Sequence, residues 1–258
     1  NKYGKALPAG YIEESTPSVA ATDVEIAASL KGADDIRLSL TRARRRNDQA
    51  LRFKLFRYGN PIALSEALPM MEHMGLRVLS EHPYQMNLGG DSRIFIQDFE
   101  VQPVVGHVDA EAVRESFQSA FERTWRGDAE SDAFNRLILS AGLDWRQVAM
   151  LRGYCKFLLQ TGVPFSQAYM EEALNRYPMI ARLLVELFEA KFDPSREGGT
   201  KQSQDQARKR LARDLEMVMP EDMAKAHAAE AVLAARQDDR ATQMEAVGKL
   251  LRAALDRV

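Results

Sequence analysis

The chain has 258 residues, 45% hydrophobic and 28% charged, which is the composition of a globular protein with a core and excludes a disordered chain. Its net charge of −2 provides no overall positive field for nucleic acid or an anionic membrane. The single cysteine, Cys155, cannot form an internal disulfide, and no apolar run is long enough to span a bilayer, so we expect a cytoplasmic protein with no membrane partner.

The first 33 residues predict an N-terminal extension. They are polar and turn-rich at the start, and one short helix is expected from Ser18 to Leu30. The chain opens on Asn1 instead of methionine, and Asn1–Gly10 has no apolar stretch of the kind found in a signal peptide. We therefore expect the chain to be part of a longer protein.

Two strands are predicted next, because apolar and polar residues alternate with a period of two. The alternation runs over Asp35–Ala43 and again over Leu51–Tyr58. The charged stretch Arg44–Gln49 separates them. The pattern predicts a β-hairpin.

A helix is predicted over Ile62–Met74, after the break at Gly59. Asn60 is the expected N-cap, and Pro61 suits the first helical position because its missing N–H is not needed there. Pro69 lies inside this helix and predicts a kink or an interruption.

The order of elements then completes a small α+β module over residues 34–127. Leu76–Met86 and Arg93–Val101 predict a second hairpin, and Asp109–Arg126 predicts an amphipathic helix. The order ββαββα predicts a four-stranded antiparallel sheet with strand order first–second–fourth–third and both helices on one face. This is an ACT-like, circularly permuted ferredoxin-like arrangement. The apolar residues expected to face the two helices are Leu51, Phe53, Leu55, Ile94 and Ile96.

Residues 128–258 predict an all-α helical region. Trp145–Gln160 and Ile180–Phe192 carry broad apolar faces and are expected to pack in a core. Glu197–Gln206 is polar and contains glycine, which indicates a link, and Thr200–Met219 indicates an exposed, charged helix.

The sequence contains no recognisable catalytic constellation. It has no glycine-rich nucleotide loop, and Gly198–Lys201 follows no predicted strand, so it indicates a linker. His73 and His82 each follow a glutamate directly, a spacing at which side chains diverge and do not share a metal ion. We expect no catalytic residue, no metal and no cofactor in this chain.

The turn before the first helix of the module is the candidate ligand site. A glycine at a strand-to-helix turn and free N–H groups at a helix start form an anion-binding pocket. Gly59, Asn60 and Ile62 would bind the carboxylate of a ligand such as an amino acid. The alternative is a capped helix start with no ligand.

A second candidate is an RNA-binding module. Arg42 and the arginines 44–46 form a basic cluster at a hairpin tip. An open sheet face with aromatic side chains would stack bases. Acidic residues flank the same strands and the net charge is negative, so a sheet face covered by a protein partner is the favoured interpretation. The aromatic candidates are Phe56, Tyr58, Phe95 and Phe99.

Several long strings of the sequence resemble a known family. They are Phe56–Gly59, Leu64–Val78, Glu81–Tyr84, Phe121–Gly127 and Ala141–Val148. These strings are similar to the regulatory region of the large bacterial NAD-specific glutamate dehydrogenases, and the resemblance covers most of Tyr11–Phe192.

The resemblance implies that the module is one of the ACT-like modules that precede the dehydrogenase domain in that family. The parent enzyme would convert glutamate to 2-oxoglutarate and ammonium with NAD bound in its catalytic domain. The family's catalytic lysines and its nucleotide-binding glycine loop have no matching positions here. The expected partners are the catalytic domain and the other regulatory modules of the parent chain, in a homo-oligomer and without nucleic acid.

Overall fold

The computed structural model describes residues 3–32, 34–43, 50–90, 92–160 and 165–192, together with residues 205, 206, 209, 210 and 213. It divides into two units, Asn1–Asp132 and Ala133–Val258, which are described separately. The predicted turn Arg44–Gln49 lies outside the described residues. So do nearly all of the predicted link Glu197–Gln206 and helix Thr200–Met219.

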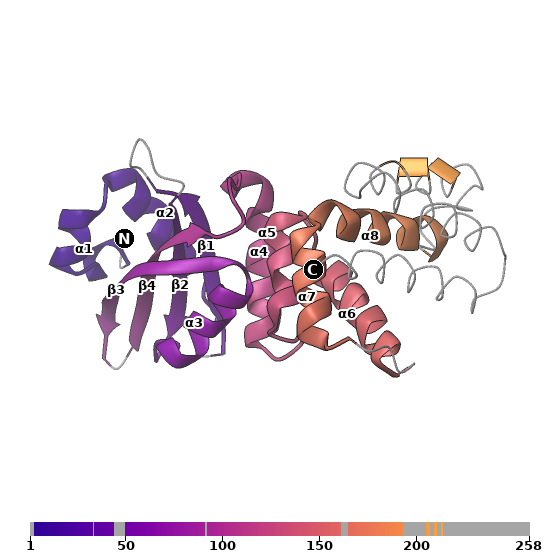
Figure 1. Ribbon diagram of the computed structural model, residues 1–258. Helices are drawn as coiled ribbons and strands as arrows, with labels where there is room; N and C mark the ends of the chain where they lie inside the picture. The colour runs from indigo at the N-terminus through magenta and orange to yellow at the C-terminus, as the bar shows by residue number, and fades with distance from the viewer. Residues whose placement is uncertain are drawn as a thin grey trace. The chain divides into compact units, whose positions relative to one another are not determined.

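The first unit contains the predicted four-stranded antiparallel sheet. The strand order is β1-β2-β4-β3, which confirms the permuted arrangement (Figure 1). All three strand pairs are antiparallel. The second hairpin is longer than predicted, because its pairing extends from Leu76↔Pro103 to Gly89↔Ser92. The strands are β1 (Ile36–Arg42), β2 (Leu51–Tyr58), β3 (Leu76–Gly89) and β4 (Ser92–Pro103).

One side of the sheet, which we call the Phe53 face, packs against α3 (Leu64–His73) and α4 (Ala110–Trp125). The Phe53 ring meets the rings of Phe117 and Phe121 edge-on, with centroids 5.1 and 5.0 Å away. All three side chains are fully buried. Edge-on aromatic packing of this kind is favourable beyond the area that it buries. The interruption predicted at Pro69 is absent, because α3 is continuous through this residue.

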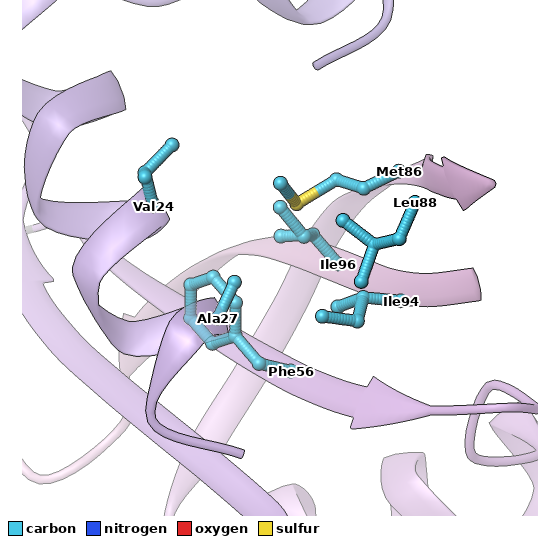
Figure 2. Close-up of a cluster of buried hydrophobic side chains, with 7 residues drawn as sticks. All are labelled: Val24, Ala27, Phe56, Met86, Leu88, Ile94 and Ile96. Carbon is cyan, nitrogen blue, oxygen red and sulfur yellow. The ribbon is translucent and has the colours of Figure 1, made fainter. Parts of the chain in front are cut away.

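The other side of the sheet, the Lys54 face, is covered by the N-terminal segment, residues 3–30. This segment contains a 3₁₀ turn, η1 (Gly4–Ala6), and two helices, α1 (Ala9–Glu14) and α2 (Pro17–Ala28). Figure 2 shows helix α2 over the apolar part of this face. The buried side chains of this cluster are Val24, Ala27, Phe56, Met86, Leu88, Ile94 and Ile96.

The position of Ile94 and Ile96 corrects the sequence prediction. Ile94 pairs with Tyr58 and Ile96 with Phe56, so both belong to the Lys54 face and not to the face that carries α3 and α4. Alternate residues of a strand point to opposite faces, and the β2–β4 register decides which apolar set of β4 joins which face. Both faces of the sheet are therefore buried against helices.

Side chains of α4 close the outer edge of β1. The Gln118 amide accepts a hydrogen bond from the Leu40 N–H at 3.2 Å and donates one to the Leu38 carbonyl at 3.0 Å. Arg114 Nε donates to the Leu40 carbonyl at 2.9 Å. These bonds satisfy backbone groups that a sheet edge otherwise exposes to pairing with another strand.

The second unit is helical. A buried pair of polar side chains lies in its core, where Arg152 donates to the Asn135 side-chain oxygen at 2.8 Å. The Arg152 guanidinium also lies 5.7 Å from the centre of the Phe134 ring. Within the part of the chain that the structure describes, no helix combines the length and the apolar character needed to cross a bilayer. The elements are η2 (Ala133–Arg136), α5 (Leu137–Ser140), α6 (Trp145–Gln160), α7 (Gln167–Arg176) and α8 (Pro178–Phe192).

Candidate functional site

The predicted ligand turn follows strand β2 directly. Gly59 has φ = +84°, a backbone conformation that favours glycine. Its N–H donates to the Arg93 carbonyl at 2.9 Å, and the Asn60 N–H donates to the Tyr58 carbonyl at 3.1 Å. These two amides are therefore engaged within the protein.

Helix α3 begins later than predicted. It starts at Leu64, its N-cap is Ala63, and no side chain caps it, so the prediction of Asn60 as N-cap and Pro61 as first helical residue is wrong. The physical reason is that Gln97, a residue of strand β4, binds the backbone of Ile62. Gln97 accepts from the Ile62 N–H at 2.9 Å and donates to the Ile62 carbonyl at 3.0 Å.

This pair of bonds, which we call the Gln97 clamp, takes the Ile62 carbonyl out of the helix ladder and satisfies the Ile62 N–H, which has no partner within a helix at such a position. A glutamine amide carries a donor and an acceptor, so one buried side chain satisfies both groups. Gln97 and Ile62 are both buried, so neither group has water as an alternative partner. Ligand binding at Gly59, Asn60 and Ile62 stays a prediction, and the free N–H of Ile62 on which it relied is occupied.

A cluster of buried charges lies on the Lys54 face, and sequence reasoning missed it. The ammonium group of Lys54 contacts the carboxylate of Asp23 in α2 and lies 3.5 Å from the carboxylate of Asp98 in β4. These residues are only 6%, 3% and 5% exposed. Buried charges persist only when they are paired, and here Asp23 and Asp98 are the partners of Lys54.

Further polar groups complete this charge cluster. The Tyr11 hydroxyl donates to Asp23, and Lys54 Nζ lies 5.3 Å from the centre of the Tyr11 ring. Arg52 Nη1 lies 3.1 Å from Asp98 Oδ1 and forms the partly exposed end of the cluster. Burial, together with the hydrogen bond to Asp23, raises the pKa of the Tyr11 hydroxyl well above its ordinary value.

The rim of the cluster ties α1 to strand β3. Glu14 accepts from the Tyr84 hydroxyl at 2.5 Å, and His82 Nδ1 lies 3.2 Å from the same carboxylate oxygen. The Tyr84 ring meets the Tyr11 ring edge-on at 5.0 Å. The hydrogen bond from Tyr84, followed by the one from His82, lowers the pKa of Glu14. These contacts join the N-terminal segment to an edge strand of the sheet.

The sequence held a weak signal for this cluster. Lys54 stands in a strand between the apolar residues Phe53 and Leu55, and Asp98 stands in β4 between a glutamine and a phenylalanine. A charge in a strand that is buried on both faces needs an opposite charge nearby. The third partner, Asp23, lies 31 positions before Lys54 and could not be paired with it without the fold.

The aromatic platform proposed for RNA is not exposed. Phe56 is fully buried under the N-terminal segment, and Phe99 is fully buried on the opposite face, where it pairs with Phe53. Arg42 forms an ion pair with Asp109, and the arginines 44–46 lie outside the described residues. The described part of the chain contains no group of three or more side chains that could hold a metal ion.

A permuted four-stranded sheet with helices on both faces, followed by a helical unit, defines the class as an ACT-type α+β module joined to helical segments. Comparison with protein families agrees. Residues 1–30 match helical motif 2 of glutamate dehydrogenase, residues 35–113 match its ACT3 domain, and residues 129–194 match its helical motif 3. The chain belongs to the glutamate dehydrogenase family, as a segment that carries these three modules in order.

Curated relatives from three bacteria agree with this assignment. The chain is 40% identical over 77% of its length to the NAD-specific glutamate dehydrogenase of Halomonas elongata, and 40% identical over 74% to that of Pseudomonas aeruginosa. It is 34% identical over 80% of its length to the NAD-specific glutamate dehydrogenase of Mycobacterium tuberculosis. The chain spans about an eighth of the length of these relatives, because the matches cover 12%, 12% and 13% of them.

Proposed function

We propose that this chain is a regulatory and assembly segment of an NAD-dependent glutamate dehydrogenase, and that the reaction itself is carried out by another part of the parent protein. In the parent, glutamate would be oxidised to 2-oxoglutarate and ammonium. The match of three successive non-catalytic modules of the family supports this proposal. The segment would act through the catalytic domain and the other modules of a homo-oligomeric parent.

The packing of the sheet favours an assembly role over a ligand-sensing role. The Lys54 face carries the module that matches helical motif 2, and the Phe53 face carries α3 and α4. The sheet is thus a platform on which helices from different modules meet. In the candidate sensing turn, by contrast, the N–H groups of Gly59, Asn60 and Ile62 are all engaged.

The first test measures NAD-dependent oxidation of glutamate by the 258-residue chain and by the full-length parent protein. We expect turnover by the parent and none by this chain. A regulatory role also predicts that Lys54→Met in the parent changes the dependence of rate on glutamate concentration, or the oligomeric state. Turnover by the chain itself would contradict the proposal, as would a Lys54→Met parent indistinguishable from the unmodified protein.

The second test separates assembly from amino-acid sensing. Amino acids are titrated into the chain in a calorimeter, with Asn60→Ala as the matched variant because the Asn60 side chain is exposed. An assembly role predicts no heat of binding. Heat with one amino acid, abolished by Asn60→Ala, would assign the segment a sensing role at the predicted turn.

A further inference from the structure

The two faces of the sheet are packed with different chemistry. The Phe53 face is held by aromatic contacts between Phe53, Phe117 and Phe121. The Lys54 face carries an ion-pair network at its centre, with Lys54 between Asp23 and Asp98. Burying charges costs solvation energy that the pairing largely offsets, so an interface of this kind adds little net stability compared with an apolar one.

The N-terminal segment contributes few fully buried side chains to this interface, and the largest of them is Tyr11, whose hydroxyl bonds to Asp23. From α2, only Val24 and Ala27 belong to the buried cluster. Apolar attraction grows with the area removed from water, and α1 and α2 bury fewer apolar residues than α3 and α4, so the segment is held more weakly than these helices. The partly buried residues that pack around the cluster from this segment are Tyr3, Ala6, Leu7, Ile26 and Leu30.

The charge balance makes Asp23 the critical group of the segment. The buried groups that the sheet contributes are Lys54 and Asp98, and Asp98 is shared, because Arg52 Nη1 lies 3.1 Å from its other oxygen. The segment supplies the balancing carboxylate, Asp23, which the Tyr11 hydroxyl orients. Without the Asp23 charge, the docked segment would bury the Lys54 ammonium with only the shared carboxylate of Asp98, 3.5 Å away, which is costly.

The connection between the segment and strand β1 has its own anchors. Asp35 accepts from the Lys31 N–H at 3.0 Å and pairs with Arg37 at 2.5 Å. Arg37 Nε also donates to the Ser29 hydroxyl at 3.2 Å. These contacts hold the connection beside the start of β1 independently of the buried cluster, so a segment that left the sheet would remain tethered and would return readily.

We propose that the N-terminal segment is a hinged cover of the Lys54 face, held by the Asp23 charge, that opens as a unit while α3 and α4 stay packed. This proposal rests on the proposed regulatory role. It states that the contact between helical motif 2 and the sheet of the ACT3 domain opens and closes, whereas the contact of α3 and α4 with the sheet stays closed. The uncovered face presents Phe56, Ile94 and Ile96 next to the pair formed by Lys54 and Asp98. The partner that fits it is a helix of small apolar side chains with one buried carboxylate, the chemistry of α2 itself.

Native-state hydrogen exchange on the unmodified 258-residue chain tests the opening. Amide exchange in α2 and α4 is followed at increasing, sub-denaturing urea concentrations. We expect the best-protected amides of α2 to be at least about 10-fold less protected than those of α4. The free energy of the opening that exposes the α2 amides should also depend less steeply on urea concentration, because this opening exposes less surface. Equal protection with equal urea dependence would show that the unit opens only as a whole, and would overturn the proposal.

Asp23→Asn tests the dependence on charge, with Glu25→Gln as the matched control. Both substitutions turn a carboxylate of α2 into an amide, but Asp23 is buried and Glu25 is exposed. We expect Asp23→Asn to accelerate exchange in α1 and α2 by about 10-fold or more and to leave α4 unchanged, and Glu25→Gln to change neither. No acceleration, or equal acceleration in α4, refutes the hinged cover. Exchange reports only on opening, so this failure is separate from a failure of the proposed function in the activity assays.

Discussion

Phe53 and Lys54 are consecutive residues of β2 whose side chains enter different layers of the same unit. Phe53 packs between Phe117 and Phe121 of α4, whereas Lys54 pairs with Asp23 of α2. One strand therefore joins an apolar layer and a charged layer, each covered by its own helices. The alternation of side chains along a strand makes this possible.

The apolar layer should dominate the stability of the sheet unit. Phe53→Ala removes a fully buried ring and leaves a cavity, and substitutions of this kind cost about 3–5 kcal/mol. We expect a loss in that range for the first unit, measured by urea unfolding followed by circular dichroism. Leu79→Ala in β3 is the control, because Leu79 is 50% exposed, and it should cost less than about 1 kcal/mol. A small effect at Phe53 would show that the aromatic layer is not the main core.

The clamp between Gln97 and Ile62 should be costly to remove. Gln97→Leu keeps the approximate size of the side chain but leaves the Ile62 N–H and carbonyl unpaired in a buried place. Each of the two buried unpaired groups costs about 1–3 kcal/mol, so we expect a loss of about 2–6 kcal/mol in unfolding free energy. Gln85→Leu in β3 is the control, since the Gln85 side chain donates to the exposed Asn87 side chain. Equal effects of the two variants would argue against the clamp.

Alkaline pH should weaken the fold through Tyr11. The pKa of its hydroxyl is raised in the folded protein, first by burial and then by the bond to Asp23. A group with a raised folded pKa stabilises the fold below its unfolded pKa, about 10 for tyrosine, and this contribution is lost as pH rises above that value. Tyr11→Phe should lower stability near pH 8 by about 1–2 kcal/mol and flatten the decline between about pH 9 and 11. Urea unfolding of both proteins across this range checks the prediction, and parallel pH profiles would contradict it.

Two glycines of the helical unit should respond to alanine in opposite directions. Gly142 has φ = +64°, which alanine tolerates poorly, and an added Cβ would lie 2.9 Å from Arg182 Nη2, the movable end of a side chain. We expect Gly142→Ala to destabilise the unit by about 1 kcal/mol or more because of backbone strain.

Gly153, in contrast, lies exposed within α6 and has open space around it. Gly153→Ala should stabilise the unit by about 0.5–1 kcal/mol, because alanine favours the helix. Thermal unfolding of the two variants measures the difference. Destabilisation by both substitutions would indicate an unrecognised constraint in α6.

Much of the fold could be predicted from the local pattern. Alternation in Leu51–Tyr58 and helical spacing in Asp109–Arg126 identify elements without knowledge of their neighbours, because the period of the apolar residues differs between a strand and a helix. The ββαββα order then restricts the sheet to few topologies, and the predicted one is confirmed. The start of α3 was placed wrongly because the side chain that determines it, Gln97, lies 35 residues away.

By itself the sequence determined the four strands of the sheet and their order and, through its long family strings, the family to which the segment belongs. Only the tertiary structure decided that the second sheet face is covered by the chain's own N-terminal segment, and that Asp23, Lys54 and Asp98 form one cluster. The physical reason is that the periodicity of a sequence indicates which residues are buried, but not which residues bury them. The helices that cover a sheet face and the carboxylates that pair with a buried lysine are remote in the chain.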